Sequence, residues 1–286
     1  MNQSDNKNTC RLCGSKNSQP YIKELWQCQD CSFCFIPLNQ EMEKEILKQY
    51  SENKVSSAEY YKKTIKLDQK NFYEKLRIIG RFSSPTTMID VGGNVGTFSE
   101  SAKAFDWQPI VFEPNPVAAE AAEQKGFKTI KDFFSFEACQ KNLVDPVDCV
   151  VLNDVLEHVT DPVSMLKDVW KILNNNGVVA VTTPDIDNYF CQRYQIKPAE
   201  HLVYFSKKTL KEAFEKSGFE VLFCQSVSRF RNVTMAAENP TASMSRFDKL
   251  LGRIAKNNFV NLLLSYLLKL FVKDEILIIG QKNDSP

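Results

Sequence analysis

MIDVGGNVGTF, from Met88 to Phe98, and VFEPNP, from Val111 to Pro116, are the two stretches that decide the fold of this chain. The first is an apolar run that ends in Asp90 and opens into a glycine-rich loop. A helix-like segment separates it from the second apolar run, which ends in Glu113. A strand, a glycine-rich turn, a helix and a second strand that ends in a carboxylate form the beginning of a nucleoside-binding βαβ unit.

The glycines allow a tight turn and let a ligand lie against bare backbone, because they lack a Cβ atom. Glu113, at the tip of the second strand, is placed to accept hydrogen bonds from two ribose hydroxyls. A dinucleotide fingerprint requires glycine at its first, third and sixth positions. Counting from Gly92, the third position is Asn94 and the sixth is Thr97, so the sequence does not match an NAD site.

The loop resembles motif I of class I S-adenosylmethionine-dependent methyltransferases, which has the form D-x-G-x-G-x-G. Asp90, Gly92 and Gly96 match this motif, and Asn94 stands in place of its middle glycine. Asparagine tolerates positive φ better than other non-glycine residues, so we expect the loop to form. The resemblance implies that S-adenosylmethionine is held by Asp90, Gly92, Gly93, Asn94, Gly96, Glu113, Asp132 and Asn153.

A second match lies between Val147 and Asp185, which read as strand, helix, turn and strand. A buried-strand run ends at Asn153, and apolar residues then recur at helical spacing from Val155 to Leu173. Val178 to Val181 is the next β-branched run. With its D-V-L-E-H sequence, this segment resembles the fourth and fifth strands of the same family. The two matches predict an α/β fold with a Rossmann-like, seven-stranded methyltransferase sheet.

Five of the nine cysteines lie near the N-terminus, in two C-x-x-C pairs followed by Cys34. Each pair places two thiolates on one tight turn, so the two pairs predict a closed, tetrahedral Zn²⁺ site made by Cys10, Cys13, Cys28 and Cys31. A site with four protein ligands has no open position, which makes the zinc structural. Cys34 is an alternative ligand to Cys31. Such a zinc ribbon before a methyltransferase domain resembles bacterial sugar and small-molecule methyltransferases.

We therefore expect a zinc ribbon over residues 1–38, a helical cap or linker over 39–83, and a methyltransferase domain over 84–286. Ser206 is predicted to cap a helix over residues 207–216, and 274–282 resembles the antiparallel seventh strand of the family. A helical insertion spans about 231–273. Its apolar run over residues 259–272 is shorter than the ~20 residues that cross a bilayer. We expect a cleft cover or a dimer helix there, with attachment to a membrane surface as an alternative.

Composition excludes other classes of protein. A net charge of +1 and a pI near 7.5 give no general attraction to nucleic acid or to a membrane. The N-terminus has no apolar stretch typical of a secretory signal, so a cytoplasmic protein is expected, with metal-bound or buried thiols in place of disulfides. No membrane span is expected, and a homodimer is left open.

Both histidines of the chain fall where the strand ends open onto the cleft. His201 lies in AEHLVYFS, which resembles the E-H-x-x-Y-F-S segment near the acceptor site of sugar methyltransferases, where the histidine acts as a base. We expect His201 to remove the acceptor's proton, with a rate that rises through the imidazole pKa, and Glu200 and Tyr204 to orient it or the acceptor. The alternative is that His201 positions the loop by hydrogen bonding. His158 is a second catalytic candidate.

Asp154, Glu157 and His158 stand at i, i+3 and i+4, which places them on one face of a helix. Some members of the wider family bind Mg²⁺ or a similar ion through an acidic-x-x-Glu-His motif, so this set is an alternative metal site. The expected function is methyl transfer from S-adenosylmethionine to a small-molecule or sugar-nucleotide acceptor, at a hydroxyl. The alternatives are metal-assisted O-methylation of a quinone or phenol, and a degenerate methyltransferase fold that serves as a binding scaffold.

Overall fold

The computed structural model describes residues 8–38, 56–198, 200–231 and 254–283, together with residues 42, 44, 45, 48 and 233. Most of the first part of the predicted cap, residues 39–55, lies outside the described residues. The same is true of most of the insertion between 232 and 253.

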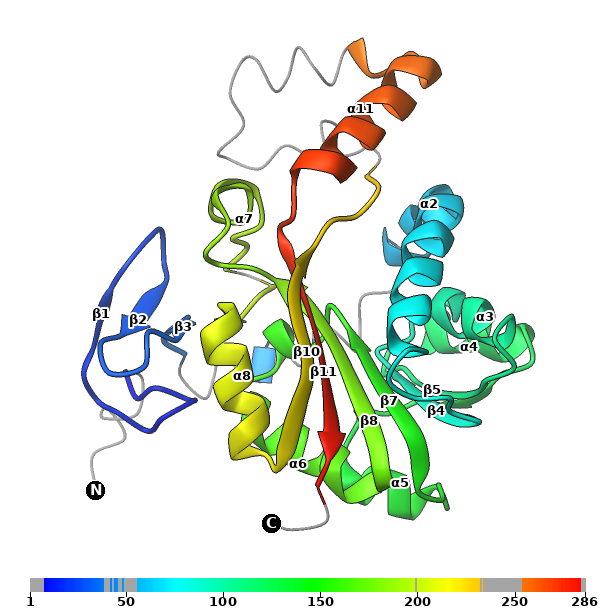
Figure 1. Cartoon of the computed structure of the whole chain (residues 1–286), viewed down its shortest axis with the longest axis horizontal. Coiled ribbons are helices and arrows are strands. Elements are labelled where there is room, and N and C mark those ends of the chain that lie inside the picture. The colour runs from blue at the N-terminus through cyan, green and yellow to red at the C-terminus, as the bar shows by residue number, and fades with distance from the viewer. Residues whose placement is uncertain are drawn as a thin grey trace.

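A seven-stranded sheet in the order β10-β11-β8-β7-β4-β5-β6 forms the centre of the molecule (Figure 1). Its strands are β4 (Thr87–Val91), β5 (Gln108–Phe112), β6 (Lys128–Ile130), β7 (Val147–Asn153), β8 (Leu173–Pro184), β10 (Phe219–Val227) and β11 (Glu275–Lys282). Strands β4 to β8 pair in parallel, and β11 runs antiparallel between β8 and β10. The predicted Rossmann-like sheet with an antiparallel last strand is confirmed.

Helices cover both faces of the sheet, because its inner strands are apolar on both sides. Along β7, Cys149 and Val151 pack with α2 (Ser56–Ile79) and α3 (Thr97–Lys103), whereas Val150 and Leu152 pack with α6 (Pro162–Ile172) and α8 (Lys207–Lys216). The other elements are α4 (Pro116–Gln124), α5 (Phe136–Lys141), α7 (Tyr189–Tyr194), α11 (Asn258–Phe271) and the 3₁₀ turn η1 (Leu156–His158). Helices α7 and α11 stand at the carboxyl edge of the parallel strands (Figure 1).

The helix after β7 begins later than the apolar spacing predicts. Asp161 is its N-cap and Pro162 occupies its first turn, so α6 starts at Pro162 and not at Val155. Ahead of it lies only the single turn η1, and Asp154 adopts a left-handed φ of 53°. Asp154 and His158 therefore do not share one face of an α-helix, which corrects the geometry expected for the alternative metal site.

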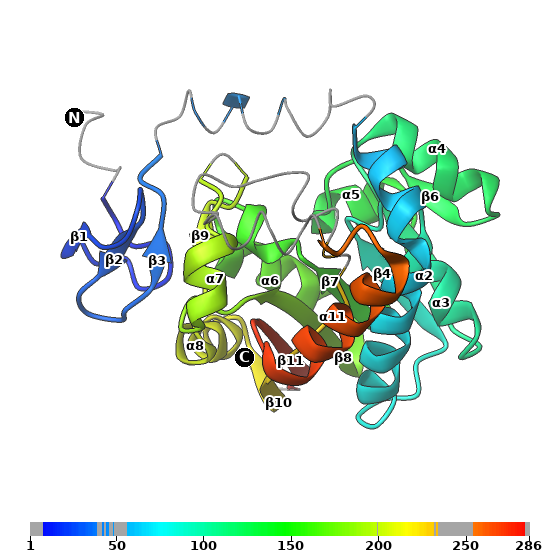
Figure 2. The same ribbon diagram turned by 90° about the horizontal axis from the view of Figure 1, so that it is seen from above.

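The N-terminal ribbon is a small sheet in the order β1-β2-β3-β9, made by β1 (Ser18–Pro20), β2 (Trp26–Cys28), β3 (Cys34–Phe35) and β9 (Val203–Tyr204). Its last strand comes from the segment that follows β8, and the rings of Phe33 and Phe205 pack with centroids 5.2 Å apart. The ribbon lies beside α7 and α8 (Figure 2), and Lys216 Nζ donates a hydrogen bond to Leu12 O at 3.1 Å. The sheet of the ribbon thus continues into the methyltransferase part of the chain.

Candidate functional site

The glycine-rich loop between β4 and α3 brings bare backbone to the carboxyl edge of the sheet. Gly92 and Gly96 have φ of 64° and 74°, and a Cβ atom on Gly92 would lie 2.9 Å from Val155 Cγ2. Asn94 takes a φ of 49°, in the left-handed region that asparagine tolerates. The loop therefore forms with asparagine in place of the middle glycine, as expected from the sequence.

The carboxylate of Glu113 holds this loop in place. Its Oε2 accepts a hydrogen bond from the Asn94 N–H at 2.9 Å, and its Oε1 accepts one from the Asn115 N–H at 2.8 Å. Burial raises the pKa of this carboxyl, and the two N–H groups oppose that shift. Each carboxylate oxygen has two lone pairs, so one on each oxygen remains for the hydroxyls of a ligand.

Three more of the predicted cofactor-binding residues stand at the ends of β4, β6 and β7. Asp90 Oδ2 accepts a hydrogen bond from Ser99 Oγ at 2.7 Å, and burial raises the pKa of Asp90 to about 7. Asn153, the last residue of β7, has a buried Nδ2 that finds no hydrogen-bond partner among the described residues. Asp132 is exposed just after β6 and accepts from the Phe133 N–H at 2.8 Å. An unpaired buried donor beside bare glycine backbone is the environment that a polar ligand would fill.

A charge cluster lies beside this cradle, and Asp154 is its one member that the sequence analysis singled out. Lys75, on α2, donates to Thr182 Oγ1 at 3.0 Å and lies 3.8 Å from the Glu275 carboxylate. Arg229 Nη1 lies 2.7 Å from Glu275 Oε1 and 3.5 Å from Asp154 Oδ2. The four charged groups come from α2, from the segment after β7, from the segment after β10 and from β11, so no local motif marks the set as a whole. Asp154 thus belongs to this cluster.

Three other side chains meet where β7 and β8 end. The ligand atoms of Glu157, His158 and His201 all lie within 4.8 Å of one another, and the two imidazole rings are edge-to-face with centroids 4.8 Å apart. Glu157 Oε2 accepts from Thr183 Oγ1 at 3.0 Å. In the part of the chain that the structure describes, Glu157 Oε1 and His201 Nδ1 are buried without a hydrogen-bond partner. Two unpaired polar atoms in one buried cluster are typical of a functional site.

Burial controls the protonation of this cluster. It lowers the pKa of His201 to about 2, with further contributions from nearby His158 and Lys197, and it also lowers the pKa of His158. It raises the pKa of Glu157 well above the usual value, and the charge of Asp154 adds to this rise. Burial thus favours the neutral form of both imidazoles and of the Glu157 carboxyl.

Tyr204 and Glu200, which were expected to orient His201, lie differently relative to it. Tyr204 is close, with its ring centroid 5.7 Å from that of His201, and its hydroxyl accepts from the Lys197 N–H at 2.8 Å. The Glu200 carboxylate is exposed and pairs with Lys197 Nζ at 3.0 Å. The Glu200 carbonyl contacts the cluster, at 2.7 Å from His158 Nδ1. The backbone of Glu200 thus contributes to the cluster, and its carboxylate lies at the exposed rim.

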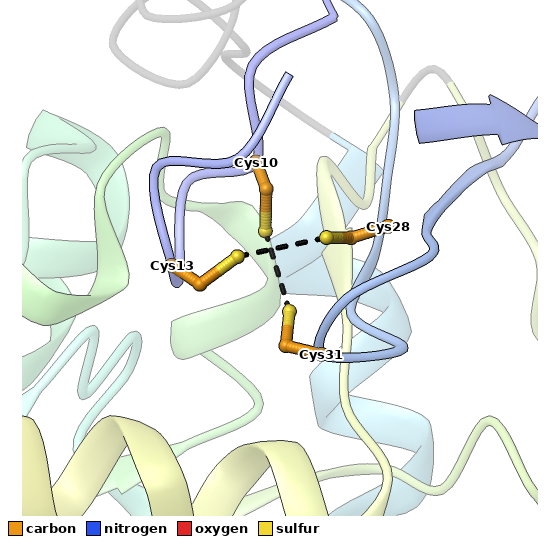
Figure 3. A group of neighbouring side chains, drawn as sticks. All are labelled: Cys10, Cys13, Cys28 and Cys31. Carbon is orange, nitrogen blue, oxygen red and sulfur yellow. Dashed lines mark hydrogen bonds between the residues drawn. The ribbon is translucent and has the colours of Figure 1, made fainter. Parts of the chain in front are cut away.

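The four predicted zinc ligands converge on one point (Figure 3). The Sγ atoms of Cys10 and Cys31 lie 3.5 Å apart, as do those of Cys13 and Cys28, and all four are within 4.8 Å of one another. A tetrahedron with Zn–S bonds of about 2.3 Å has S···S distances of about 3.8 Å, so the cluster fits zinc. Cys34 lies outside it, with its Sγ 3.7 Å from Ser32 O.

Comparison with known proteins identifies the family to which the chain belongs. A family model described as a methyltransferase domain matches residues 65–222, more than half of the chain, so the chain belongs to this methyltransferase family. It is an S-adenosylmethionine-dependent methyltransferase, as the sequence predicted. The residues of the cradle fit the cofactor of this family, whose ribose hydroxyls Glu113 would hold beside the glycine loop.

Solved structures show the same fold at low sequence identity. A SAM-dependent methyltransferase from Archaeoglobus fulgidus is 19% identical, with a TM-score of 0.54, over 78% of this chain and 99% of that one. A SAM-dependent methyltransferase from Thermotoga maritima, described as a possible histamine N-methyltransferase, is 17% identical, with a TM-score of 0.53, over 84% of this chain and 100% of that one. No curated protein matches the sequence significantly. These likenesses support the fold and not a particular acceptor.

Proposed function

We propose that the protein transfers a methyl group from S-adenosylmethionine to a hydroxyl of a small, sugar-like acceptor, such as a sugar nucleotide, and that His201 is the general base. The observation that carries this proposal is the buried His201 Nδ1, which has no partner among the described residues and lies where β7 and β8 end. The cradle is adjacent, because Val155, two residues before Glu157, packs against Gly92.

The cofactor supplies an activated methyl group on a sulfonium, and the residues of the chain do the rest. Glu113 and the loop from Gly92 to Gly96 would bind it and fix its direction. His201 would accept the acceptor's proton at Nδ1. His201 would then carry that proton as an imidazolium and release it to solvent before the next turnover. The Glu157 carboxyl lies within 4.8 Å of this charge. His201 is buried and His158 is half-buried, which limits the access of water to the base.

Under this proposal, the lowered pKa of His201 changes the pH dependence that is expected for the turnover rate. Because burial lowers the pKa of His201 to about 2, the neutral base form is present throughout the physiological range. The turnover rate of the wild type should therefore not rise with pH near about 6.5, the ordinary imidazole pKa. The pH profiles of the wild type and of the His201→Ala variant should have the same shape in that range.

The experiment offers the protein S-adenosylmethionine and a panel of nucleoside diphosphate sugars, and detects methylated product by mass spectrometry. His201→Ala should lower turnover by about 10²–10⁴, the usual contribution of a general base, while cofactor affinity is unchanged. Glu200→Ala is the matched control, because its exposed carboxylate pairs with Lys197 and not with His201. Equal turnover in the wild type and the His201→Ala variant would reject the base assignment.

A second candidate is metal-assisted O-methylation of a quinone or phenol, favoured by the same cluster. The structure changes the donor set from Asp154, Glu157 and His158 to Glu157, His158 and His201, because Asp154 instead faces Arg229 at 3.5 Å. Two imidazoles and one carboxylate suit a transition metal better than Mg²⁺. Such an ion would polarise the acceptor hydroxyl.

Calorimetric titration with Mn²⁺ or Co²⁺ separates the two candidates. Under the metal scheme the zinc-loaded protein binds one further ion, His158→Ala abolishes that binding, and activity depends on the ion. Under the base scheme no further ion binds, and activity persists in a chelator that leaves the ribbon loaded.

A further inference from the structure

Helix α11 turns its polar side toward the protein and its apolar side outward. Its polar residues Asn261, Ser265 and Lys269 recur every four positions, which places them on one stripe. Each bonds to the body of the protein: Asn261 Oδ1 accepts from Val233 N at 3.0 Å, Ser265 Oγ accepts from Arg231 N at 3.0 Å, and Lys269 Nζ donates to Ser228 O at 2.8 Å. This is the reverse of an ordinary surface helix.

The outward side is almost entirely apolar. Its exposed residues are Phe259, Leu262, Leu263, Tyr266, Leu267, Leu270 and Phe271, with exposed fractions between 42% and 80%. At about 100° per residue they cover about half of the helix circumference. This stripe is wider than the seam of two residues per heptad that a paired helix covers. A contiguous apolar surface of this kind marks an interaction site.

The charges around α11 indicate which partner covers its apolar face, a second copy of the chain or a lipid surface. Residues 254–273 contain three lysines and no aspartate or glutamate. Lys256 and Lys273 are exposed and lie just before and just after the helix. A second copy packed against this face, in either direction, would bring lysines against lysines with no acid within either segment. Anionic lipid headgroups provide the opposite charge.

We propose that α11 is a membrane-surface anchor that lies in the plane of an anionic bilayer. Its apolar face would enter the boundary between headgroups and acyl chains, and Lys256 and Lys273 would lie at the lipid phosphates. In the chain as far as it is described, no helix is long and apolar enough to cross a membrane, which fits an in-plane helix.

The anchor has a consequence for the acceptor, which rests on the proposed function. Helix α11 stands at the carboxyl edge of the sheet, the edge where the cradle and the histidine cluster lie (Figure 1). An acceptor carried on a lipid would then reach the site from the bilayer. Vesicle binding is independent of methyl transfer, so it tests the anchor even where the proposed acceptor is wrong.

The test is co-sedimentation of the full chain with vesicles of phosphatidylcholine alone and of phosphatidylcholine mixed with phosphatidylglycerol. The protein should bind the anionic vesicles more tightly. The double variant Leu263→Ser/Leu270→Ser should weaken that binding by at least about tenfold. Lys256→Gln and Lys273→Gln should each weaken it by about fivefold, the usual contribution of a lysine near an anionic surface.

Leu143→Ser is the matched control, because Leu143 is a leucine 85% exposed next to α5, away from α11. It should leave vesicle binding unchanged. The proposal is overturned by failure to bind anionic vesicles, or by equal losses in Leu143→Ser and the α11 variants. It is also overturned by a dimer in solution that the α11 variants dissociate, which would identify a second copy as the occupant.

Discussion

The ribbon is hydrogen-bonded to the loop that carries His201, so loss of its metal site should loosen that loop. Strand β3 pairs with β9, with Cys34 opposite Tyr204, and the Ile36 N–H donates to Leu202 O at 2.9 Å. Leu202 in turn donates its N–H to Glu157 O at 2.7 Å. Cys28→Ser removes one of the four clustered thiolates that fit zinc, and a ribbon whose folding is coupled to metal binding should then unfold locally.

The magnitude follows from the contacts that would be lost. The hydrogen bond from Ile36 to Leu202 contributes about 1 kcal/mol, and the pairing of Phe33 with Phe205 contributes about another 1 kcal/mol. A loss of about 2 kcal/mol raises the population of the open loop by about thirtyfold. Backbone amides of residues 200–206 should therefore exchange with deuterium about thirtyfold faster.

Hydrogen exchange with mass spectrometry measures this directly and needs no acceptor. The glycine loop at Gly92 to Gly96 should keep its exchange rate, because it does not contact the ribbon. Cys34→Ser is the control: Cys34 lies in the same ribbon but outside the cluster, so metal content should persist. If Cys28→Ser loses its metal and residues 200–206 still exchange at the wild-type rate, the coupling between ribbon and loop does not exist.

Three further predictions concern the cradle and its surroundings. The pKa of Asp90 is raised from 3.8 to about 7, so the folded state keeps a proton that the unfolded chain loses. The contribution of protonated Asp90 to the free energy of unfolding, on the order of 4 kcal/mol, is therefore lost as pH rises from about 4 to about 7. Asp90→Asn should remove this pH dependence, which urea denaturation of the two proteins at several pH values measures. Gly93→Ala should destabilise the fold by about 1–3 kcal/mol in thermal denaturation, since its Cβ would lie 2.8 Å from Asp90 Oδ2 and 2.9 Å from Val111 Cγ1, and an unchanged midpoint would contradict this packing. Glu275→Gln should lower the free energy of unfolding by about 3 kcal/mol in chemical denaturation, because Arg229 and Lys75 would lose the carboxylate they share. An unchanged free energy of unfolding would show that water replaces the lost carboxylate.

The parts of the fold that the sequence predicts are those that local patterns determine. Strand β4 with its glycine loop, and α8 with its Ser206 cap, each rest on residues within about ten positions of one another. The late start of α6 was also readable, because Asp161 followed by Pro162 is a helix-start signal. The apolar spacing obscured it, since Leu156 is buried whether or not it is helical.

The parts that sequence does not predict depend on contacts between distant segments. Glu157 and His201 are 44 positions apart and meet only because β7 and β8 end side by side. The pairing of β3 with β9 joins the ribbon to the His201 loop across a still longer separation. For α11 the periodicity shows an amphipathic helix but not which side faces the protein, and the hydrogen bonds of Asn261 and Ser265 settle that point.

The central claim is that the glycine loop and Glu113 bind S-adenosylmethionine, and calorimetry with that compound tests it most directly. The wild type should bind one equivalent, and Glu113→Ala should lose about 2–3 kcal/mol of binding free energy, the usual contribution of hydrogen bonds to a charged group. Glu120→Ala, which removes an exposed carboxylate from α4, should bind as the wild type does. A wild type that does not bind, or a Glu113→Ala variant with unchanged affinity and an intact fold, would contradict the account.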